Sequence, residues 1–219
     1  MPLYTSGGAL RTSGGALAQT PASTAPDVTL IASWETGDFT NWQSAQTSDG
    51  NKQIVTSPVL DGTYAAEITS FEPEMYSLPG DGLNAYPGKG NVFVFPFRFS
   101  GGDLTAQLWF GVGDNSNFYF AELDRPDGAF RLRISDGGST STIQNESATY
   151  TSDTWYAVRV TWDDGTLGNA DNDITIELIE DPLGAATVQQ TAATNDATHA
   201  GNTGVGLNAK EFASGASMV

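Results

Sequence analysis

The sequence predicts an all-β protein, built as a sandwich of two antiparallel sheets. Between Val92 and Glu180, five apolar segments alternate with a period of two, and turns rich in Gly, Asp and Asn separate them. Successive side chains of a strand point to opposite faces, so this pattern gives each segment one buried and one solvated face. Roughly twelve short strands with turns about every ten residues are typical of a β-sandwich or jelly roll.

The strands are expected in this order along the chain: 28–34, 53–56, 64–68, 92–99, 104–112, 117–123, 130–134, 156–162, 174–178, 187–191 and 204–207. The segment 71–91 contains three prolines and several glycines, and we expect it to form a long loop. No stretch has the periodicity of an amphipathic helix.

Residues 1–27 are expected to form an extended arm in front of a single domain over residues 28–219. Gly, Ser, Thr, Ala and Pro dominate the arm, and the run 5–10 recurs at 12–17. Such a composition buries too little apolar surface to offset its ordering entropy, and it is typical of a flexible tail or linker. The alternative is an assembly arm held by a neighbouring subunit. Its contact residues would be Leu3, Tyr4, Leu10, Arg11 and Leu17.

Acidic residues dominate the charge of the chain. Asp and Glu number 26 against 9 Lys and Arg, which gives a formal net charge of -17. One interpretation is a halophilic proteome, in which hydrated carboxylates keep proteins soluble at high salt. The other is an ordinary acidic extracellular protein. Either way we expect no nucleic-acid partner, because phosphate binding needs a basic stripe and the sequence offers none.

Several functional classes find no support in the sequence. The chain has no cysteine, which excludes disulfides and thiolate sites. The single histidine, His199, is expected in an exposed loop. No segment approaches the ~20 apolar residues that span a membrane. No apolar run precedes the cleavage-like stretch 16–18, so we expect neither export by the general route nor membrane insertion.

The order of the segments resembles the concanavalin A-like, laminin-G-like jelly-roll superfamily over about residues 28–212. The matching stretches are 34–39, 97–99, 106–111, 117–123, 127–132, 154–162 and 204–207. The resemblance implies the jelly-roll fold. It leaves the activity open, because the superfamily includes lectins, glycan-binding modules, glycosidases and structural domains.

The resemblance also implies a closing strand and a structural calcium site, which uses an early Glu and a late Asp. The sequence stops in the region where that strand and its Asp would follow, so we expect the closing strand to be absent or supplied differently. The early candidates are Glu35 and Asp38. Separately, Asn169, Asp171 and Asp173 show the spacing of calcium loops, but the expected Gly and distant Glu are missing, and a solvated acidic hairpin is the alternative. Structural Ca²⁺ is the sole cofactor suggested.

Four of the six arginines fall on the polar phase of their strands. The resemblance places these strands in one sheet, which predicts a face that docks an acidic partner or a glycan. Cross-strand ion pairs are the alternative. Four aromatic residues are expected to be exposed and to stack on sugar rings: Trp109, Tyr119 and, in the long loop, Tyr76 and Tyr86. Packing in the core or between subunits is the commoner role for such residues. The predicted face comprises Arg98, Trp109, Tyr119, Arg131, Arg133 and Arg159.

The stretch 122–127 resembles the paired carboxylates of jelly-roll glycosidases. Glycoside hydrolysis needs two carboxylates that flank the scissile bond. Asp127, however, lies in the sequence Pro126-Asp127-Gly128, which predicts a hairpin turn. We therefore expect no enzyme.

Three functions follow, in order of preference. The first is a non-enzymatic virion surface protein of a halophilic archaeal tailed virus: a capsid turret, decoration or tail-fibre subunit. Its arm would hold it to its own copies, as a homo-oligomer, and to neighbouring virion proteins, and its jelly roll would bind host glycans. The second is a secreted or cell-surface carbohydrate-binding module. The third is a jelly-roll glycosidase.

Overall fold

The computed structural model of the chain describes residues 4–6, 9–11, 34, 37–44, 52–60, 62–69, 74–212 and 216–219. Within these ranges the ordered elements are strands and turns, without an α-helix. None of the described residues forms a helix that could cross a membrane. The all-β prediction is confirmed.

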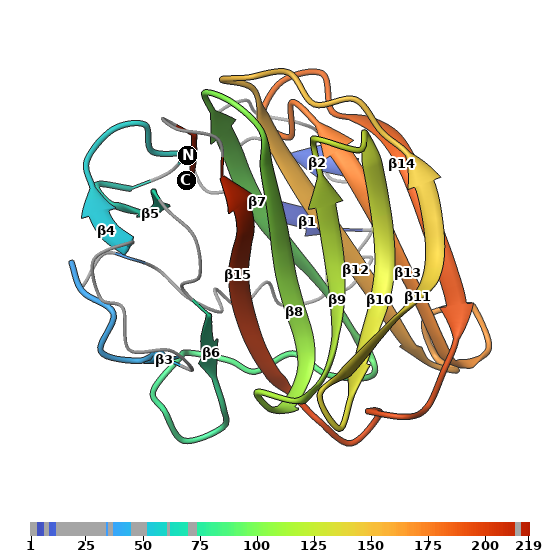
Figure 1. The fold of residues 1–219 in the computed structure, drawn as a ribbon. Helices are drawn as coiled ribbons and strands as arrows, with labels where there is room; N and C mark the ends of the chain where they lie inside the picture. Colours follow the sequence, from blue (N-terminus) through green and yellow to red (C-terminus); the bar gives the residue numbers. More distant parts are fainter. Residues whose placement is uncertain are drawn as a thin grey trace, which may run out of the picture.

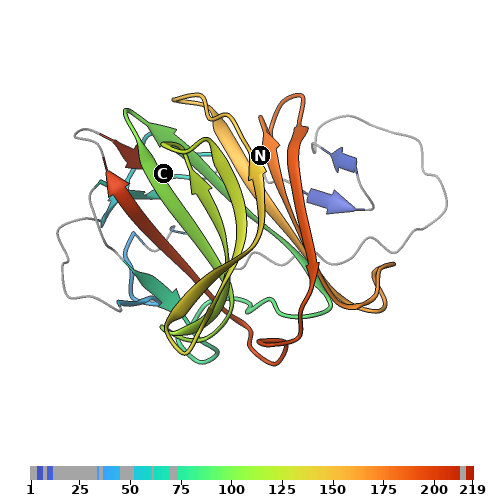
Figure 2. The same cartoon turned by 45° about the vertical axis from the view of Figure 1, so that its right-hand side comes forward.

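Two seven-stranded antiparallel sheets form the domain (Figures 1 and 2). The first sheet has the order β11 (Ser139–Ser147), β10 (Ala129–Asp136), β9 (Asn117–Asp124), β8 (Leu104–Asp114), β15 (Gly204–Phe212), β6 (Met75–Ser77) and β3 (Gln43–Ser44). The second has the order β14 (Thr187–Asn195), β13 (Asp171–Glu180), β12 (Trp155–Asp164), β7 (Asn91–Ser100), β16 (Ser217–Met218), β5 (Ala65–Ile68) and β4 (Lys52–Val55). A separate hairpin pairs β1 (Tyr4–Ser6) with β2 (Ala9–Arg11).

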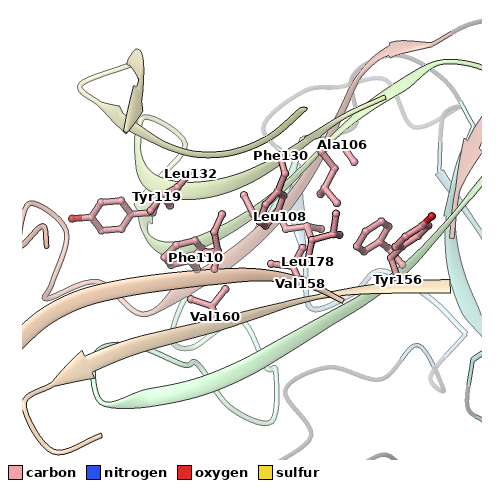
Figure 3. Close-up of a cluster of buried hydrophobic side chains, with 14 of the residues drawn as sticks. Ala106, Leu108, Phe110, Tyr119, Phe130, Leu132, Tyr156, Val158, Val160 and Leu178 are labelled. Carbon is pink, nitrogen blue, oxygen red and sulfur yellow. The ribbon is translucent and has the colours of Figure 1, made fainter. Parts of the chain in front are cut away.

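The core lies between the two sheets, where the alternating residues of the long strands meet. Figure 3 shows Leu108 and Phe110 of β8 facing Val158 and Val160 of β12. Burial of such side chains is the dominant favourable term in folding. On β7, the predicted face is confirmed, since Phe93, Phe97 and Phe99 are buried and Phe95 packs against the cluster.

Of the two expected outcomes, a closing strand that is absent or one that is supplied differently, absence is wrong: a two-residue strand without an Asp is present. Ser217 and Met218 form β16, which lies between β7 and β5. The ladder continues through Val219, whose N–H donates to Arg98 O at 2.9 Å and whose carbonyl accepts from Arg98 N at 2.7 Å. Two residues are too few to produce an alternating pattern, so the pairing depends on backbone hydrogen bonds that periodicity cannot reveal.

Other strands also differ from the predicted elements, among them β6 and β11. The strand β6 lies inside the segment 71–91, which was predicted to be a loop. The strand β11 was not predicted, because its sequence is almost entirely Ser, Thr, Asn and Gln. As the edge strand of the first sheet it needs little apolar surface, and Ile143 is its one residue that packs on the core. The predicted strand 28–34 lies outside the described residues, except for Trp34.

Met218 tests whether the short closing strand stabilises the sandwich. Its side chain is 4 % exposed. Substituting Met218→Ala removes buried methylene groups and is expected to lower the free energy of unfolding by about 2–3 kcal/mol. Val188→Ala is the control, because Val188 is 46 % exposed on an edge strand, and it should change stability by less than about 0.5 kcal/mol. Equal urea-denaturation midpoints for the two variants would contradict the assignment.

Candidate functional site

The outer face of the first sheet carries a row of polar side chains that crosses five strands. In cross-strand register, Asn208 of β15 lies opposite Gln107 of β8, which lies opposite Glu122 of β9. Glu122 lies opposite Arg131 of β10, and Arg131 lies opposite Asn145 of β11. We call these five residues the polar row. Residues that face each other in register share one face of the sheet, so the row is continuous.

Hydrogen bonds link every neighbouring pair in the polar row. Asn208 Nδ2 donates to Gln107 Oε1 at 3.2 Å, and Gln107 Nε2 donates to Glu122 Oε2 at 3.0 Å. Arg131 Nη1 donates to Glu122 Oε1 at 3.0 Å, and Arg131 Nε donates to Asn145 Oδ1 at 3.0 Å. The side chains are therefore held in fixed orientations.

Two guanidinium groups pair with the carboxylates in and beside the row. Arg133 Nη1 donates to Glu122 Oε2 at 2.7 Å, so both oxygens of Glu122 accept from a cation. Arg131 also bonds Asp124, at 2.5 Å, and Asp127, at 3.0 Å. Burial disfavours the charge on Arg131, but the hydrogen bonds to Asp124, Asp127 and Glu122 outweigh it and raise the pKa of Arg131 above its ordinary value. The predicted cross-strand ion pairs are thus present.

An aromatic cluster borders the polar row on the same face. It consists of Trp109, Val112, Phe118 and Phe120, with Tyr76 and Leu78 packed against it. The rings of Trp109 and Phe118 stack with centroids 3.9 Å apart. The guanidinium carbon of Arg133 lies 5.4 Å from the centroid of the Phe120 ring, a cation–π geometry that joins the cluster to the charged groups.

Gly206 leaves the space that the indole ring of Trp109 occupies on the outer face of the sheet. The two residues are opposite each other in β15 and β8. A Cβ on Gly206 would lie 2.8 Å from the Cε3 atom of Trp109 and 2.8 Å from the carbonyl oxygen of Met75. Only glycine allows this close approach of the ring to the backbone.

The structure divides the predicted arginine face between the two sheets. Arg131 and Arg133 lie on β10 of the first sheet. Arg98 and Arg159 lie on β7 and β12 of the second, where they pair with Asp153 at 2.8 Å and Glu177 at 2.5 Å. The prediction that all four share one sheet is wrong, because membership of a sheet is set by pairing between distant strands and not by the pattern within a strand.

Of the four predicted sugar-stacking aromatics, Trp109 and Tyr119 are buried, and Tyr76 and Tyr86 are partly buried. Tyr119 points into the core and is 0 % exposed. Its hydroxyl donates to Asp196 Oδ1 at 2.6 Å, and burial together with this carboxylate raises its pKa. Trp109 lies on the outer face but is 1 % exposed beneath its neighbours. The segment 118–121 is apolar at every position, so alternation could not tell its two faces apart. Tyr76, half-buried at the rim, is the more accessible ring.

Sequence reasoning missed the amide members of the polar row. Gln107 interrupts an apolar strand, and Asn208 follows the predicted strand 204–207 directly. A polar residue on the non-core phase of a long apolar strand was the available signal for Gln107. Their meeting with Glu122 depends on the register of β15, β8 and β9, which the sequence does not specify.

The predicted calcium loop is held together by its own hydrogen bonds. Asp171 forms an ion pair with Lys89, and Asp173 accepts from the backbone N–H of Ala170 at 2.9 Å and from Asn195 Nδ2 at 2.6 Å. The backbone N–H of Asn169 donates to a neighbouring carboxylate, that of Asp163.

The early candidates for the calcium site are Glu35 and Asp38. Asp38 accepts from Thr40 N at 3.2 Å, and Glu35 lies outside the described residues. Among the residues that the structure describes, no three His, Asp or Glu side chains converge as a metal site. Calcium binding stays a prediction.

Asp163 organises this loop from a buried position. Its carboxylate accepts from the backbone N–H groups of Gly165 at 2.6 Å, Leu167 at 3.0 Å and Asn169 at 2.7 Å. Burial alone would raise the pKa of Asp163, but the backbone donors outweigh it, and the pKa falls below its ordinary value.

His199 is buried, which corrects the prediction of an exposed histidine. It is 5 % exposed, and its Nε2 donates to the carbonyl oxygen of Ser135 at 2.7 Å. Its ring lies edge-on to Tyr119 with centroids 5.1 Å apart. His199 thus fixes the β14–β15 connection against β9 and β10.

The predicted assembly arm falls largely outside the described residues. Leu3 and Leu17 lie outside them entirely. Tyr4 and Arg11 are partners in the β1–β2 hairpin, and Leu10 pairs with Thr5. This backbone pairing is all that the structure describes there, so an anchoring role stays a prediction.

Comparisons with known proteins identify the fold. No protein-family model and no curated protein matches the chain. Among solved structures, the carbohydrate-binding module CBM66 from Bacillus subtilis is similar, with a TM-score of 0.51 and 15 % identity over 82 % of this chain and 91 % of that one.

Two further solved structures have lower scores. A β-glucanase from Bacillus licheniformis has a TM-score of 0.44 and 12 % identity, covering 86 % of this chain and 92 % of that one. The galectin LEC-6 from Caenorhabditis elegans has a TM-score of 0.40 and 11 % identity, covering 79 % of this chain and 97 % of that one. The architecture is a jelly-roll sandwich, as the resemblance implied.

Gly206 offers a test of the packing that supports the site. Gly206→Ala should lower the free energy of unfolding by about 2 kcal/mol, because the carbonyl of Met75 cannot move away from the added Cβ as a flexible side chain could. Gly201→Ala is the matched control, since nothing lies within 4 Å of its Cβ position. Thermal melts of the two variants provide the measurement, and a Gly206→Ala protein as stable as the control would refute the assigned contact.

Asp163 provides a test by pH. A group whose pKa is lower in the folded state stabilises the fold above its unfolded pKa, which for Asp is about 3.9. That contribution disappears as the pH falls through the folded value. Asp163→Asn should therefore lower the melting temperature at pH 7, and the difference from the unmodified protein should narrow below about pH 4. A difference that stays constant from pH 7 to pH 3 would rule out this role for the carboxylate.

Proposed function

We propose that the protein is a non-enzymatic carbohydrate-binding module whose site is the outer face of the first sheet. The observation that carries the proposal is the polar row, in which amide, carboxylate and guanidinium groups are fixed side by side next to an aromatic cluster. A sugar presents vicinal hydroxyls, each of which can donate and accept hydrogen bonds. Groups of fixed orientation can bond such hydroxyls without a further loss of side-chain entropy.

The accessible part of this face lies over β10 and β11. The side chains of Arg131 and Arg133 are 18 % and 23 % exposed. Beside them, Thr140, Thr142 and Asn145 of β11 are exposed. These groups supply N–H and O–H donors together with hydroxyl and amide acceptors, which are the partners that sugar hydroxyls need.

Buried polar atoms without a hydrogen-bond partner also support this face as the binding site. Across the described part of the chain, three buried side-chain nitrogen or oxygen atoms have no hydrogen-bond partner. Two of them, Arg133 Nε and Asn208 Oδ1, belong to this face. Unpaired buried polar groups are rare in folded proteins, and they often accompany a functional role. The fold shared with the carbohydrate-binding module from B. subtilis agrees with such a use of the face.

The hydrogen bonds of Glu122 favour a glycan-binding role over glycoside hydrolysis. A glycosidase needs one carboxyl group to deliver a proton and a second to act on the opposite side of the bond. Both oxygens of Glu122 accept hydrogen bonds from arginine side chains. Asp124 accepts from Arg131 and from Thr105 Oγ1. These carboxylates serve to orient the guanidinium groups.

An extracellular or cell-surface location fits this proposal. The virion-surface role predicted from the charge and the N-terminal arm has no support from the comparisons, and the viral and halophilic origins stay predictions. Glycan binding through the first sheet does not depend on either of them.

The proposal is tested on a glycan array with two site variants and one control. Arg133→Ala should weaken the binding of the best glycan roughly tenfold, because it removes a charged donor from the site. Asn145→Ala should also weaken binding, while leaving the ion pairs of Glu122 intact. Arg159→Ala removes a comparable cross-strand ion pair from the second sheet and should bind as the unmodified protein does. Absence of glycan binding, or full binding by both site variants, would refute the proposal.

A further inference from the structure

The proposed site has no surplus positive charge. Among the residues that the structure describes, the polar row and its immediate neighbours carry four carboxylates and three cations, which leaves one negative charge in excess. They are Glu74, Glu122, Asp124 and Asp127, with Arg131, Arg133 and Lys210. The chain as a whole carries a formal charge of -17, so the surrounding field also repels anions.

Every nitrogen of the Arg131 guanidinium is engaged within the protein. Its Nη1 atom bonds Glu122 and Asp124, its Nη2 atom bonds Asp127, and its Nε atom bonds Asn145. A carboxylate or sulfate is best bound by two parallel N–H groups of one arginine. Arg131 has no such pair to offer.

Arg133 is likewise held by a carboxylate of the protein. Its Nη1 atom bonds Glu122 at 2.7 Å, and its Nε atom is buried. Its Nη2 atom lies 3.5 Å from Thr140 Oγ1, a weak contact that a ligand could replace. The N–H groups of Nη2 can bond hydroxyl oxygens, but the parallel Nε and Nη2 pair is not available to an anionic group, because Nε is buried.

We propose that the site binds neutral glycans and rejects glycans that carry carboxylate or sulfate groups. This inference rests on the proposed function and specifies its ligand class. The arginines act as oriented hydrogen-bond donors whose charge is already neutralised, and the uncharged Thr140, Thr142 and Asn145 supply the neighbouring contacts. An anionic ligand would add charge to carboxylates that already outnumber the cations.

The test uses paired glycans that share a backbone and differ only in charge, such as methyl-esterified and de-esterified polygalacturonate. An array of such pairs, together with sulfated and unsulfated pairs, is probed at low salt and at about 0.5 M NaCl, where charge interactions are strongly screened. We expect at least tenfold stronger binding to the neutral member of the pair that is recognised, with little change on adding salt. Equal or stronger binding of the anionic member would overturn the ligand class and leave the proposed function standing. Binding to no glycan would remove both.

A charge variant provides an independent test of the ligand class. The side chain of Asp127 is 67 % exposed and pairs with Arg131. Asp127→Asn removes one negative charge beside the site and should raise the ratio of anionic to neutral glycan binding roughly threefold at low salt. Asp153→Asn is the matched control, because Asp153 is 62 % exposed and pairs with Arg98 on the second sheet. An unchanged ratio in Asp127→Asn, or the same rise in the control, would contradict the charge argument.

Discussion

The charge on Glu122 is the constraint around which the outer face of the first sheet is organised. Its side chain is 5 % exposed, in the middle of a sheet whose other face is the apolar core. A buried carboxylate is costly unless cations and hydrogen bonds satisfy it. Arg131 and Arg133 supply the cations from the next strand, and Gln107 supplies a neutral donor from the strand on the other side. Removal of one partner would leave a buried charge uncompensated.

The aromatic cluster and the polar row have different physical roles on this face. The cluster is closely packed and almost inaccessible, so it stiffens the sheet and does not offer a ring to a ligand. The guanidinium of Arg133 is held by two contacts, the ring of Phe120 and the carboxylate of Glu122. A side chain held by two such contacts can bond a ligand with little further loss of freedom.

The outer face of the second sheet lacks a continuous row of hydrogen-bonded polar side chains among its described residues. Its arginines form separate pairs, Arg98 with Asp153 and Arg159 with Glu177. Its exposed apolar side chains include Val92 and Val188, at 47 % and 46 % exposure. Separate pairs near the surface contribute little to stability and place few groups side by side. The contrast between the two faces locates the candidate site on the first sheet.

The sequence by itself determined the strands of the long central region and the inward face of most of them. Alternation identified Phe93, Phe97 and Phe99 on β7 and Val158 and Val160 on β12, because burial of one face imposes a period of two on a strand. The cross-strand ion pairs were also foreseeable, since charged residues on the polar phase of adjacent strands must lie near each other.

Only the tertiary structure decided which sheet each strand joins and which residues meet there. Arg98 and Arg159 have the same local pattern as Arg131 and Arg133, yet they lie on the other sheet. Tyr119 and Phe120 are neighbours in an apolar run, and only packing shows that the first points inward. The two-residue closing strand and the polar row both depend on pairing between segments far apart in the chain. Such pairing is fixed by backbone hydrogen bonds and by the fit of the whole core, which no local pattern records.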